Sequence, residues 1–188
     1  MTSESPDLVV YLMRGLPSCG KSYTARVLAQ AGGIVLETDE FFYTQVGDDP
    51  TKFDWSDDLL PQARQWNLDC FRKAMLHRIS PIIIDRGNGR NRETWEYARL
   101  ALTNGYCVEL KEPDSPQWRA VRELLADKVA NQAALDDWAD RLAEMSRATH
   151  RVPTTTIKRW MAAWQLDLTV AQILSLGKLS TNFPGSTR

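Results

Sequence analysis

Short apolar runs alternate with longer amphipathic segments through the first 110 residues of the chain. The apolar runs are typical of buried β-strands and fall at 8–14, 33–37, 81–85 and 106–110. Apolar residues at helical spacing separate these runs and predict helices over 21–31, about 57–78 and 92–104. This alternation predicts an α/β fold with a parallel sheet, in which Ile82, Ile83 and Ile84 form a central strand covered on both faces.

Only helical periodicity follows the segment Glu112-Pro113-Asp114. Ser115 is a predicted N-cap and Pro116 suits the first helical position, so we expect a helix that runs to about 130. Two more helices are predicted over about 134–147 and 154–164. The last of them places its apolar residues on one face, namely Ile157, Trp160, Met161 and Trp164.

Residues 15–22 read GLPSCGKS, which matches the phosphate loop G-x-x-x-x-G-K-[ST] between a strand and a helix. The glycines let backbone N–H groups converge on one anion, and the following helix adds the positive end of its dipole. Lys21 is expected to reach the β- and γ-phosphates and Ser22 to ligate Mg²⁺. The predicted ATP-binding residues are Gly15, Leu16, Pro17, Ser18, Cys19, Gly20, Lys21, Ser22 and Tyr23. Cys19 is either a thiolate favoured by the helix N-terminus and protected by ATP, or an inert thiol.

Carboxylates follow the second and third predicted strands, at the edge of the sheet where α/β folds bind ligands. We predict that Asp39 is a general base that takes a proton from an acceptor hydroxyl. The alternative for Asp39, and more so for Glu40, is a helix N-cap or a solvated turn. Asp85 ends the third strand, where a Walker-B aspartate holds Mg²⁺ directly or through water.

The loop after Asp85 is cationic and rich in glycine. We predict that this loop contacts the phosphoryl acceptor through Arg86, Asn88 and Arg90. The alternative is ordinary turn chemistry. The helical segment over about 115–164 carries basic residues near its end, which suits a lid over phosphates. We therefore expect one domain over 1–188, with a flexible tail over about 178–188.

The composition is that of an ordinary globular domain, with 43% hydrophobic and 25% charged residues. No apolar stretch approaches the roughly 18 residues that cross a membrane, and the polar N-terminus is unlike a signal peptide. The protein is therefore expected in the cytoplasm. Cys19, Cys70 and Cys107 are far apart, which argues against a disulfide framework, and a zinc site is not expected. The net charge of −1 argues against nonspecific coating of nucleic acid.

The motifs together resemble the polynucleotide-kinase-like P-loop kinases, a group that also takes in zeta-toxin-like AAA-type ATPases. The matching segments cover roughly 8–175 and are Arg14 to Ser22, Thr38 to Phe42, Ala63 to Asn67, Ile84 to Asn88 and Arg147 to Pro153. The resemblance implies a parallel sheet with a C-terminal helical lid and transfer of the ATP γ-phosphoryl group to a 5′-hydroxyl end. It also implies that Asp39 is the general base, that Lys21 and Ser22 bind the triphosphate and Mg²⁺, and that Arg147 is a catalytic lid arginine.

The chain departs from the family pattern at Arg64, at Arg86 and Gly87, and in the lid at Ala148 and Arg151. These departures concern the acceptor rather than ATP. A 5′-hydroxyl nucleic-acid kinase is therefore the first hypothesis, and a P-loop kinase of a sugar or nucleoside is the second. A regulatory P-loop ATPase is the third, although the sequence offers no residue beyond Glu40 to position a water. Neither the oligomeric state nor a preferred base follows from the sequence.

Overall fold

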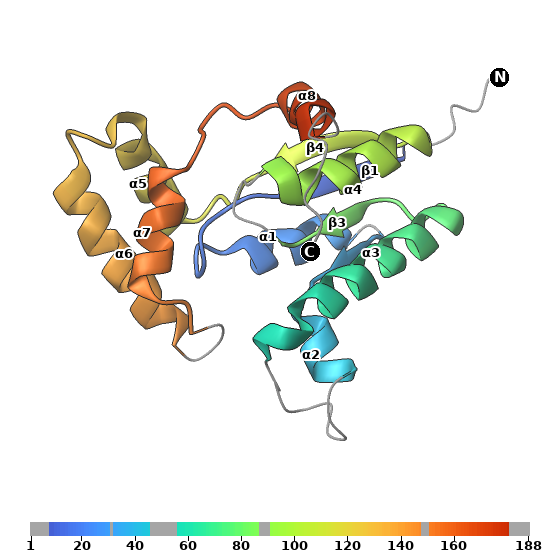
Figure 1. The fold of residues 1–188 in the computed structure, drawn as a ribbon, viewed down its shortest axis with the longest axis horizontal. Helices are drawn as coiled ribbons and strands as arrows, with labels where there is room; N and C mark the ends of the chain where they lie inside the picture. Colours follow the sequence, from blue (N-terminus) through green and yellow to red (C-terminus); the bar gives the residue numbers. More distant parts are fainter. Residues whose placement is uncertain (1–7, 31, 46–55, 87–90, 148–150, 181–188) are drawn as a thin grey trace.

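Four parallel strands form the sheet in the part of the chain that the structure describes, which confirms the predicted α/β fold (Figure 1). The structure is a computed structural model that describes residues 8–30, 32–45, 56–86, 91–147 and 151–180. The strands lie in the order β2-β3-β1-β4 and span Val9–Met13 (β1), Ile34–Leu36 (β2), Ile82–Ile84 (β3) and Cys107–Lys111 (β4). The first three lie within predicted apolar runs, and β4 extends one residue beyond its predicted run, to Lys111. The three isoleucines of β3 are buried between β1 and β2 as expected.

The strand register brings the carboxyl ends of the strands to one edge of the sheet. Leu12 of β1 pairs with Ile84 of β3 and with Leu110 of β4, and Leu36 of β2 also pairs with Ile84. The loops that carry the predicted phosphate-binding and acidic residues therefore begin side by side.

Helices cover both faces of this sheet. On one face lies α1 (Lys21–Ala29), whose Ala25 packs against Met13 and Ile83. On the other face lie α3 (Leu60–Leu76), α4 (Asn91–Thr103) and α8 (Val170–Ser180). The three layers enclose the main hydrophobic core, to which Phe71 of α3 and Ile173 of α8 contribute.

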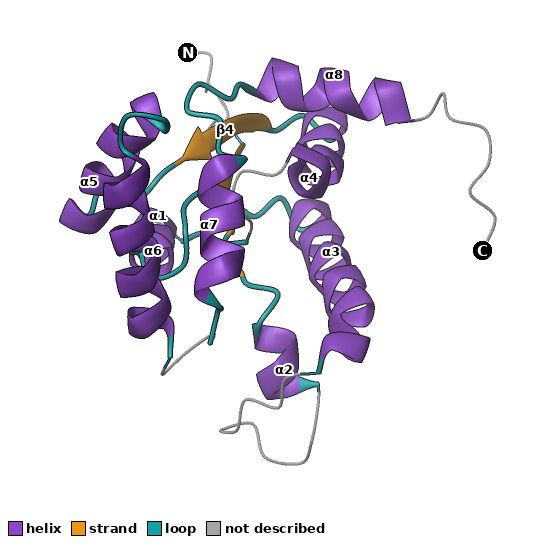
Figure 2. Cartoon of the chain, turned by 60° about the vertical axis from the view of Figure 1, so that its left-hand side comes forward, coloured by secondary structure: helices purple, strands orange, loops and turns teal. Residues whose placement is uncertain are grey.

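The lid is a helical unit beside the sheet, at the left of Figure 1 and Figure 2. It consists of α5 (Pro116–Leu124), α6 (Gln132–Ser146) and α7 (Thr154–Ala162). The predicted N-cap is confirmed, because Ser115 Oγ accepts a hydrogen bond of 3.0 Å from the Trp118 N–H. The predicted apolar face of α7 is also confirmed, since Ile157 and Met161 are buried in the lid core. The helix predicted to about 130 is shorter, and a 3₁₀ turn over Leu125–Asp127 follows α5.

Two helices were not predicted, α2 (Glu40–Thr44) and α8, and a 3₁₀ turn over Asp57–Leu59 forms the start of the helix predicted over about 57–78. A capping box opens α8. Thr169 Oγ1 accepts from the Gln172 N–H at 3.2 Å, and Gln172 Oε1 accepts from the Thr169 N–H at 2.8 Å. The helix α4 begins at Asn91, one residue before its predicted start. Of the tail predicted to be flexible, Lys178 to Ser180 belong to α8 and 181–188 lie outside the described residues.

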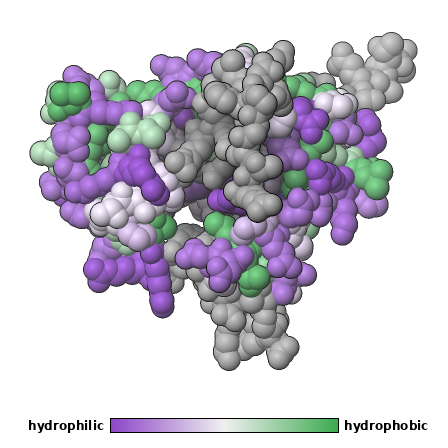
Figure 3. Space-filling view, in the orientation of Figure 1, coloured by the Kyte–Doolittle hydropathy of each residue, from purple (hydrophilic) through white to green (hydrophobic). Residues whose placement is uncertain are grey.

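Hydrophilic side chains cover most of the described surface on the face drawn in Figure 3, and apolar side chains form small separate patches. Small patches of this kind are normal for a globular domain. Among the described residues, none of the helices is long and apolar enough to cross a membrane.

Candidate nucleotide site

The phosphate loop turns from the end of β1 into the start of α1. Gly20 precedes α1 with φ 84°, a left-handed conformation that favours glycine, and Ser18 has φ 58°. A Cβ at Gly15 would lie 2.9 Å from Lys21 Cγ, so only glycine lets the Lys21 side chain pass. Among the described residues no side chain caps α1 and no acidic residue occupies its first turn. The N-terminus of α1 is therefore suited to an anion.

Lys21 extends back over the loop that precedes it. Its Nζ donates a hydrogen bond of 3.0 Å to the Leu16 carbonyl oxygen. Burial lowers the pKa of Lys21, while the charges of Asp85, Cys19, Asp39 and Glu37 act in the opposite direction. The ammonium group therefore lies within electrostatic reach of the carboxylates at the ends of β2 and β3.

Asp85 and Thr38 leave polar atoms unpartnered at this edge of the sheet. Asp85 is only 8% exposed and its Oδ2 has no hydrogen-bond partner among the described residues. The Oγ1 of Thr38, 7% exposed, likewise has no partner within the described ranges. An orphaned carboxylate oxygen near Lys21 fits a ligand that supplies positive charge or hydrogen-bond donors.

These residues fit Mg²⁺ in the manner of P-loop proteins. Asp85 offers a carboxylate, and Ser22 lies in the first turn of α1. The described part of the chain has no group of three or more His, Cys, Asp and Glu residues able to hold a metal. Mg²⁺ usually keeps several waters and uses one or two protein ligands together with substrate phosphates, so the small donor set agrees with this ion.

The acidic segment after β2 carries Glu37, Asp39 and Glu40. Asp39 occupies the N-cap position of α2, but its side chain does not cap that helix. Asp39 is half-buried, whereas Glu40 is exposed. Burial raises the pKa of Glu37, and the charge of Asp85 raises it further. Glu37 was not predicted as a site residue, because it ends an apolar run and was interpreted as the last residue of a strand.

Cys19 is buried in the phosphate loop, with 1% of its surface exposed. Burial raises the pKa of its thiol to about 11, and the nearby charge of Lys21 offsets only part of this effect. The expectation of a favoured thiolate is therefore wrong, because desolvation outweighs the positive end of α1 and the lysine. The alternative of an inert, shielded thiol agrees with the structure.

A buried arginine joins the phosphate loop to the lid. Arg14 is 2% exposed, its Nη1 lies 3.2 Å from Glu112 Oε1, and its guanidinium carbon lies 4.7 Å from the ring centroid of Trp164. The Arg14 Nη2 donates to the Gln165 carbonyl oxygen. Glu112 also accepts from Trp118 Nε1 at 3.1 Å. Sequence reasoning did not find this network, because Glu112 lies 98 residues and Gln165 151 residues after Arg14 along the chain.

The lid also touches the phosphate loop directly. Ser115 Oγ donates a hydrogen bond of 2.9 Å to the Cys19 carbonyl oxygen. Leu16 and Cys19 are buried in the same hydrophobic cluster as Trp118 and Leu142 of the lid. The start of the lid and the phosphate loop therefore form one packed unit.

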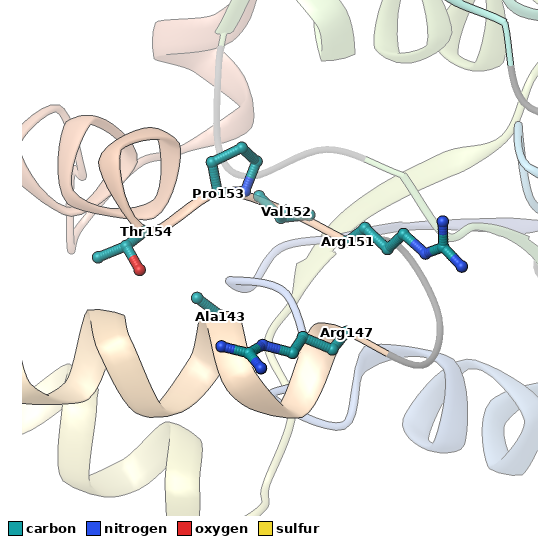
Figure 4. A pocket seen from close by; sticks show the side chains of 6 residues that line it. All are labelled: Ala143, Arg147, Arg151, Val152, Pro153 and Thr154. Atoms are coloured by element: carbon teal, nitrogen blue, oxygen red, sulfur yellow. The ribbon is translucent and has the colours of Figure 1, made fainter.

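A cavity of about 440 Å³ lies where α6 ends and α7 begins (Figure 4). It is lined by Ala143, Arg147, Arg151, Val152, Pro153 and Thr154. In Figure 4 the guanidinium of Arg147 lies beneath Ala143, and that of Arg151 extends in the opposite direction. Arg147 has a side chain that is 77% exposed, and its Nε lies 2.8 Å from Glu144 Oε2.

The other predicted site residues are scattered or only partly described. Arg86 is half-buried and contacts Tyr97 of α4. Asn88 and Arg90 lie outside the described residues. Tyr23 is 76% exposed on α1, so its predicted contact with ATP stays a prediction. The structure therefore brings Lys21 within electrostatic reach of Asp39 and Asp85, whereas Arg147 pairs with Glu144 on the lid.

Comparisons with known proteins agree with this fold. A family model described as an AAA domain matches residues 10–166, which takes in the sheet, the phosphate loop and the lid. The chain belongs to this AAA-domain family of P-loop NTPases. Membership accounts for the phosphate loop and the parallel sheet, and it supports nucleotide binding and an NTPase-type or kinase-type activity. Within the family, the choice of phosphoryl acceptor is a separate question.

One relative is NEDD4-binding protein 2 from Homo sapiens, which is 36% identical to this AAA-domain chain over 110 residues. The match covers 57% of this chain and 6% of the human protein. The likeness therefore concerns one segment of a much longer protein, and the activity and partners of the whole human protein are not carried over by it.

Proposed function

We propose that the protein is an ATP-dependent kinase that transfers the γ-phosphoryl group to a hydroxyl, with a 5′-hydroxyl nucleic-acid end as the favoured acceptor. The observation that carries this proposal is the grouping of carboxylates around Lys21, namely Asp85, Asp39 and Glu37. A phosphate-binding lysine beside an acidic group at the carboxyl edge of the sheet is the arrangement that phosphoryl transfer to a hydroxyl requires.

The roles of the residues follow from their positions. The backbone of the phosphate loop and the N-terminus of α1 bind the anionic triphosphate, and Lys21 balances its charge. Asp39 accepts the proton of the attacking hydroxyl while the acceptor oxygen forms its bond to the γ-phosphorus and the bond to ADP breaks.

Asp85 and Ser22 would hold Mg²⁺, which when bound neutralises charge on the phosphate oxygens. Arg147 would reach the phosphates from the end of α6 when the lid closes. Its ion pair with Glu144 is exposed, and exposed pairs contribute only about 0–1 kcal/mol, so breaking it costs little.

Transfer from γ-labelled ATP is the direct test. Labelled product is measured with 5′-hydroxyl DNA and RNA oligonucleotides beside a panel of nucleosides and sugars. We expect label at the 5′ end of an oligonucleotide. The Lys21→Ala variant should lose both nucleotide binding and transfer, because a charge on phosphate is removed while little packing is lost.

Lys73→Ala is the matched control, since Lys73 is an exposed lysine on α3 away from the site. Mg·ATP should raise the melting temperature of the wild type and of this control, and leave that of Lys21→Ala unchanged. Label on a sugar or nucleoside alone would favour a metabolite kinase, which the near-neutral charge also suits. Release of free phosphate with no labelled acceptor would instead identify an ATPase and refute the kinase proposal.

A further inference from the structure

Arg86 contacts one neutral side chain, Tyr97, which a second neutral side chain, Asn67, holds in place. Its Nη1 donates to the Tyr97 hydroxyl at 3.4 Å, and its guanidinium carbon lies 5.8 Å from the centroid of the Tyr97 ring. The Tyr97 hydroxyl in turn donates to Asn67 Oδ1 at 2.7 Å. The chain of donors therefore runs from Arg86 at the edge of the sheet through α4 to α3.

Tyr97 and Asn67, the two residues that support Arg86, are themselves rigidly placed. Tyr97 is 3% exposed and Asn67 is fully buried. Burial raises the pKa of Tyr97, so its hydroxyl keeps the proton that it donates to Asn67 and offers a lone pair to Arg86. The Tyr97 ring also packs on Phe71, with ring centroids 5.2 Å apart. Arg86 therefore rests on a support that cannot easily move.

The positive charge of Arg86 is unbalanced within the described residues, where no carboxylate pairs with it. Other arginines of the chain differ in this respect. Arg72 pairs with Asp69 at 2.8 Å and with Glu96 at 3.3 Å, and Arg14 pairs with Glu112. A half-buried guanidinium fixed by neutral groups beside Asp85 is suited to an anionic ligand.

Arg86 lies on the side of the sheet opposite the helix that starts at the phosphate loop. Its supports belong to α3 and α4, which pack on one face, whereas α1 packs on the other. This placement separates Arg86 from the N-terminus of α1 and assigns it to the ligand that approaches from the α3 and α4 side.

We propose that Arg86 anchors a phosphate of the acceptor, with Tyr97 and Asn67 as positioning residues. This inference rests on the proposed function and narrows its substrate class. The acceptor is then a hydroxyl compound that carries a phosphomonoester or phosphodiester close to the reacting hydroxyl, as at a nucleic-acid 5′ end. A neutral nucleoside or sugar lacks the group that Arg86 binds.

Two acceptors that differ by one phosphate test this assignment, a nucleoside and its 3′-phosphate. A charge-assisted contact should make kcat/KM for the 3′-phosphate about 10- to 100-fold higher in the wild type. In Arg86→Gln this preference should fall to near one, with KM for ATP unchanged. Arg72→Gln is the matched control, because it removes an arginine of α3 that is already paired with carboxylates.

The positioning role is tested by Tyr97→Phe, which removes the hydroxyl but keeps the ring. We expect it to raise KM for the 3′-phosphate by several-fold and to leave KM for the nucleoside and for ATP unchanged. The double variant with Arg86→Gln should be no worse than Arg86→Gln alone, since both changes act on one contact. Tyr106→Phe is the control, because the Tyr106 hydroxyl donates to the Ile79 carbonyl at 3.0 Å outside this chain of donors.

If Arg86→Gln lowers kcat/KM equally for both acceptors, or raises KM for ATP, Arg86 does not anchor an acceptor phosphate. An additive double variant would overturn the positioning role. If the wild type phosphorylates neither these two compounds nor a 5′-hydroxyl oligonucleotide, the proposed function is wrong, and calorimetric binding of the two compounds decides the anchor by itself. Tighter binding of the 3′-phosphate by the wild type but not by Arg86→Gln would then support it, and equal binding would overturn it.

Discussion

The guanidinium of Arg14 lies 4.7 Å from the ring centroid of Trp164, which places a buried positive charge between the phosphate loop and the end of α7. Cation–π contacts of this kind gain strength when water is excluded. Burial lowers the pKa of Arg14, but an arginine stays protonated at any physiological pH. The charge therefore needs both Trp164 and Glu112 to be stable in the core.

Arg14→Met should destabilise the fold. Removing one partner of a buried pair costs about 3–5 kcal/mol, although Glu112 is 19% exposed and keeps Arg122 at 2.9 Å, so we expect the lower end of this range. Urea unfolding measures the loss. Arg119→Ala is the control, because its pair with Asp114 is exposed and should contribute little to stability. Equal stabilities for the two variants would show that the Arg14 network does not hold the lid.

Asp39→Asn should separate chemistry from binding. The amide cannot accept the hydroxyl proton as a base, so transfer should fall by about 10² to 10⁴ while the Kd for ATP changes little. Single-turnover transfer and equilibrium binding are the two measurements. Asp58→Asn is the control on an exposed turn. Full activity in Asp39→Asn would remove this residue from catalysis.

Arg147→Ala should lower transfer by up to about 10³ and leave ATP binding nearly unchanged, because an arginine finger stabilises charge that develops in the transition state. Arg151→Ala should have a smaller effect, since the polynucleotide-kinase-like pattern has glycine at this position. Arg141→Ala serves as the control, because Arg141 lies over Trp138 on α6 with 5.4 Å to the ring centroid. A loss of ATP affinity that matches the loss of transfer would contradict the predicted role.

The raised pKa of Glu37 predicts how stability depends on pH. The folded protein binds this proton more tightly than the unfolded chain, so the stabilising effect is complete below the ordinary value of 4.5 and is lost as the pH rises through the higher folded value. Glu37→Gln should therefore melt at a higher temperature than the wild type near pH 7, and the difference should disappear below about pH 4. Glu123→Gln on the exposed side of α5 should show no such dependence.

Cys19 should resist alkylation at neutral pH, because its thiol is buried and its pKa is raised to about 11. Cys107 is exposed and should be labelled first by iodoacetamide. Peptide mass spectrometry of folded and urea-unfolded protein distinguishes the two sites. Labelling of Cys19 in the folded protein as fast as Cys107 would restore the hypothesis of a reactive thiolate.

The sequence predicted the sheet well because short apolar runs mark its strands, most clearly β3, whose three isoleucines are all buried. The helix α2 escaped prediction since its five residues are too few for a periodic pattern. The helix α8 had a usable signal, the capping box at Thr169 and Gln172, but Gly177 interrupts the following pattern.

The site residues also divide into those that a local sequence motif predicts and those that only tertiary packing brings together. Lys21 and Asp85 could be predicted, because each follows a strand at a fixed offset and parallel strands bring these ends together. The partners of Arg86 and Arg14 could not, since Tyr97 and Trp164 approach them only through tertiary packing. The sequence could not decide between the two alternatives for the Cys19 thiol, because burial in the lid core, which decides its pKa, cannot be read from the loop motif.

The burial of Leu16 and Cys19 among the lid side chains limits which parts of the lid can change without disturbing the phosphate loop. A lid exchanged as a whole would strip the phosphate loop of its apolar support and damage ATP binding along with acceptor choice. New specificities are therefore accessible mainly at the far end of the lid, around the turn from α6 to α7, where substitutions leave the surface against the loop intact. The same reasoning advises a protein engineer to retain Trp118 and Ser115 and to vary the residues near Thr154.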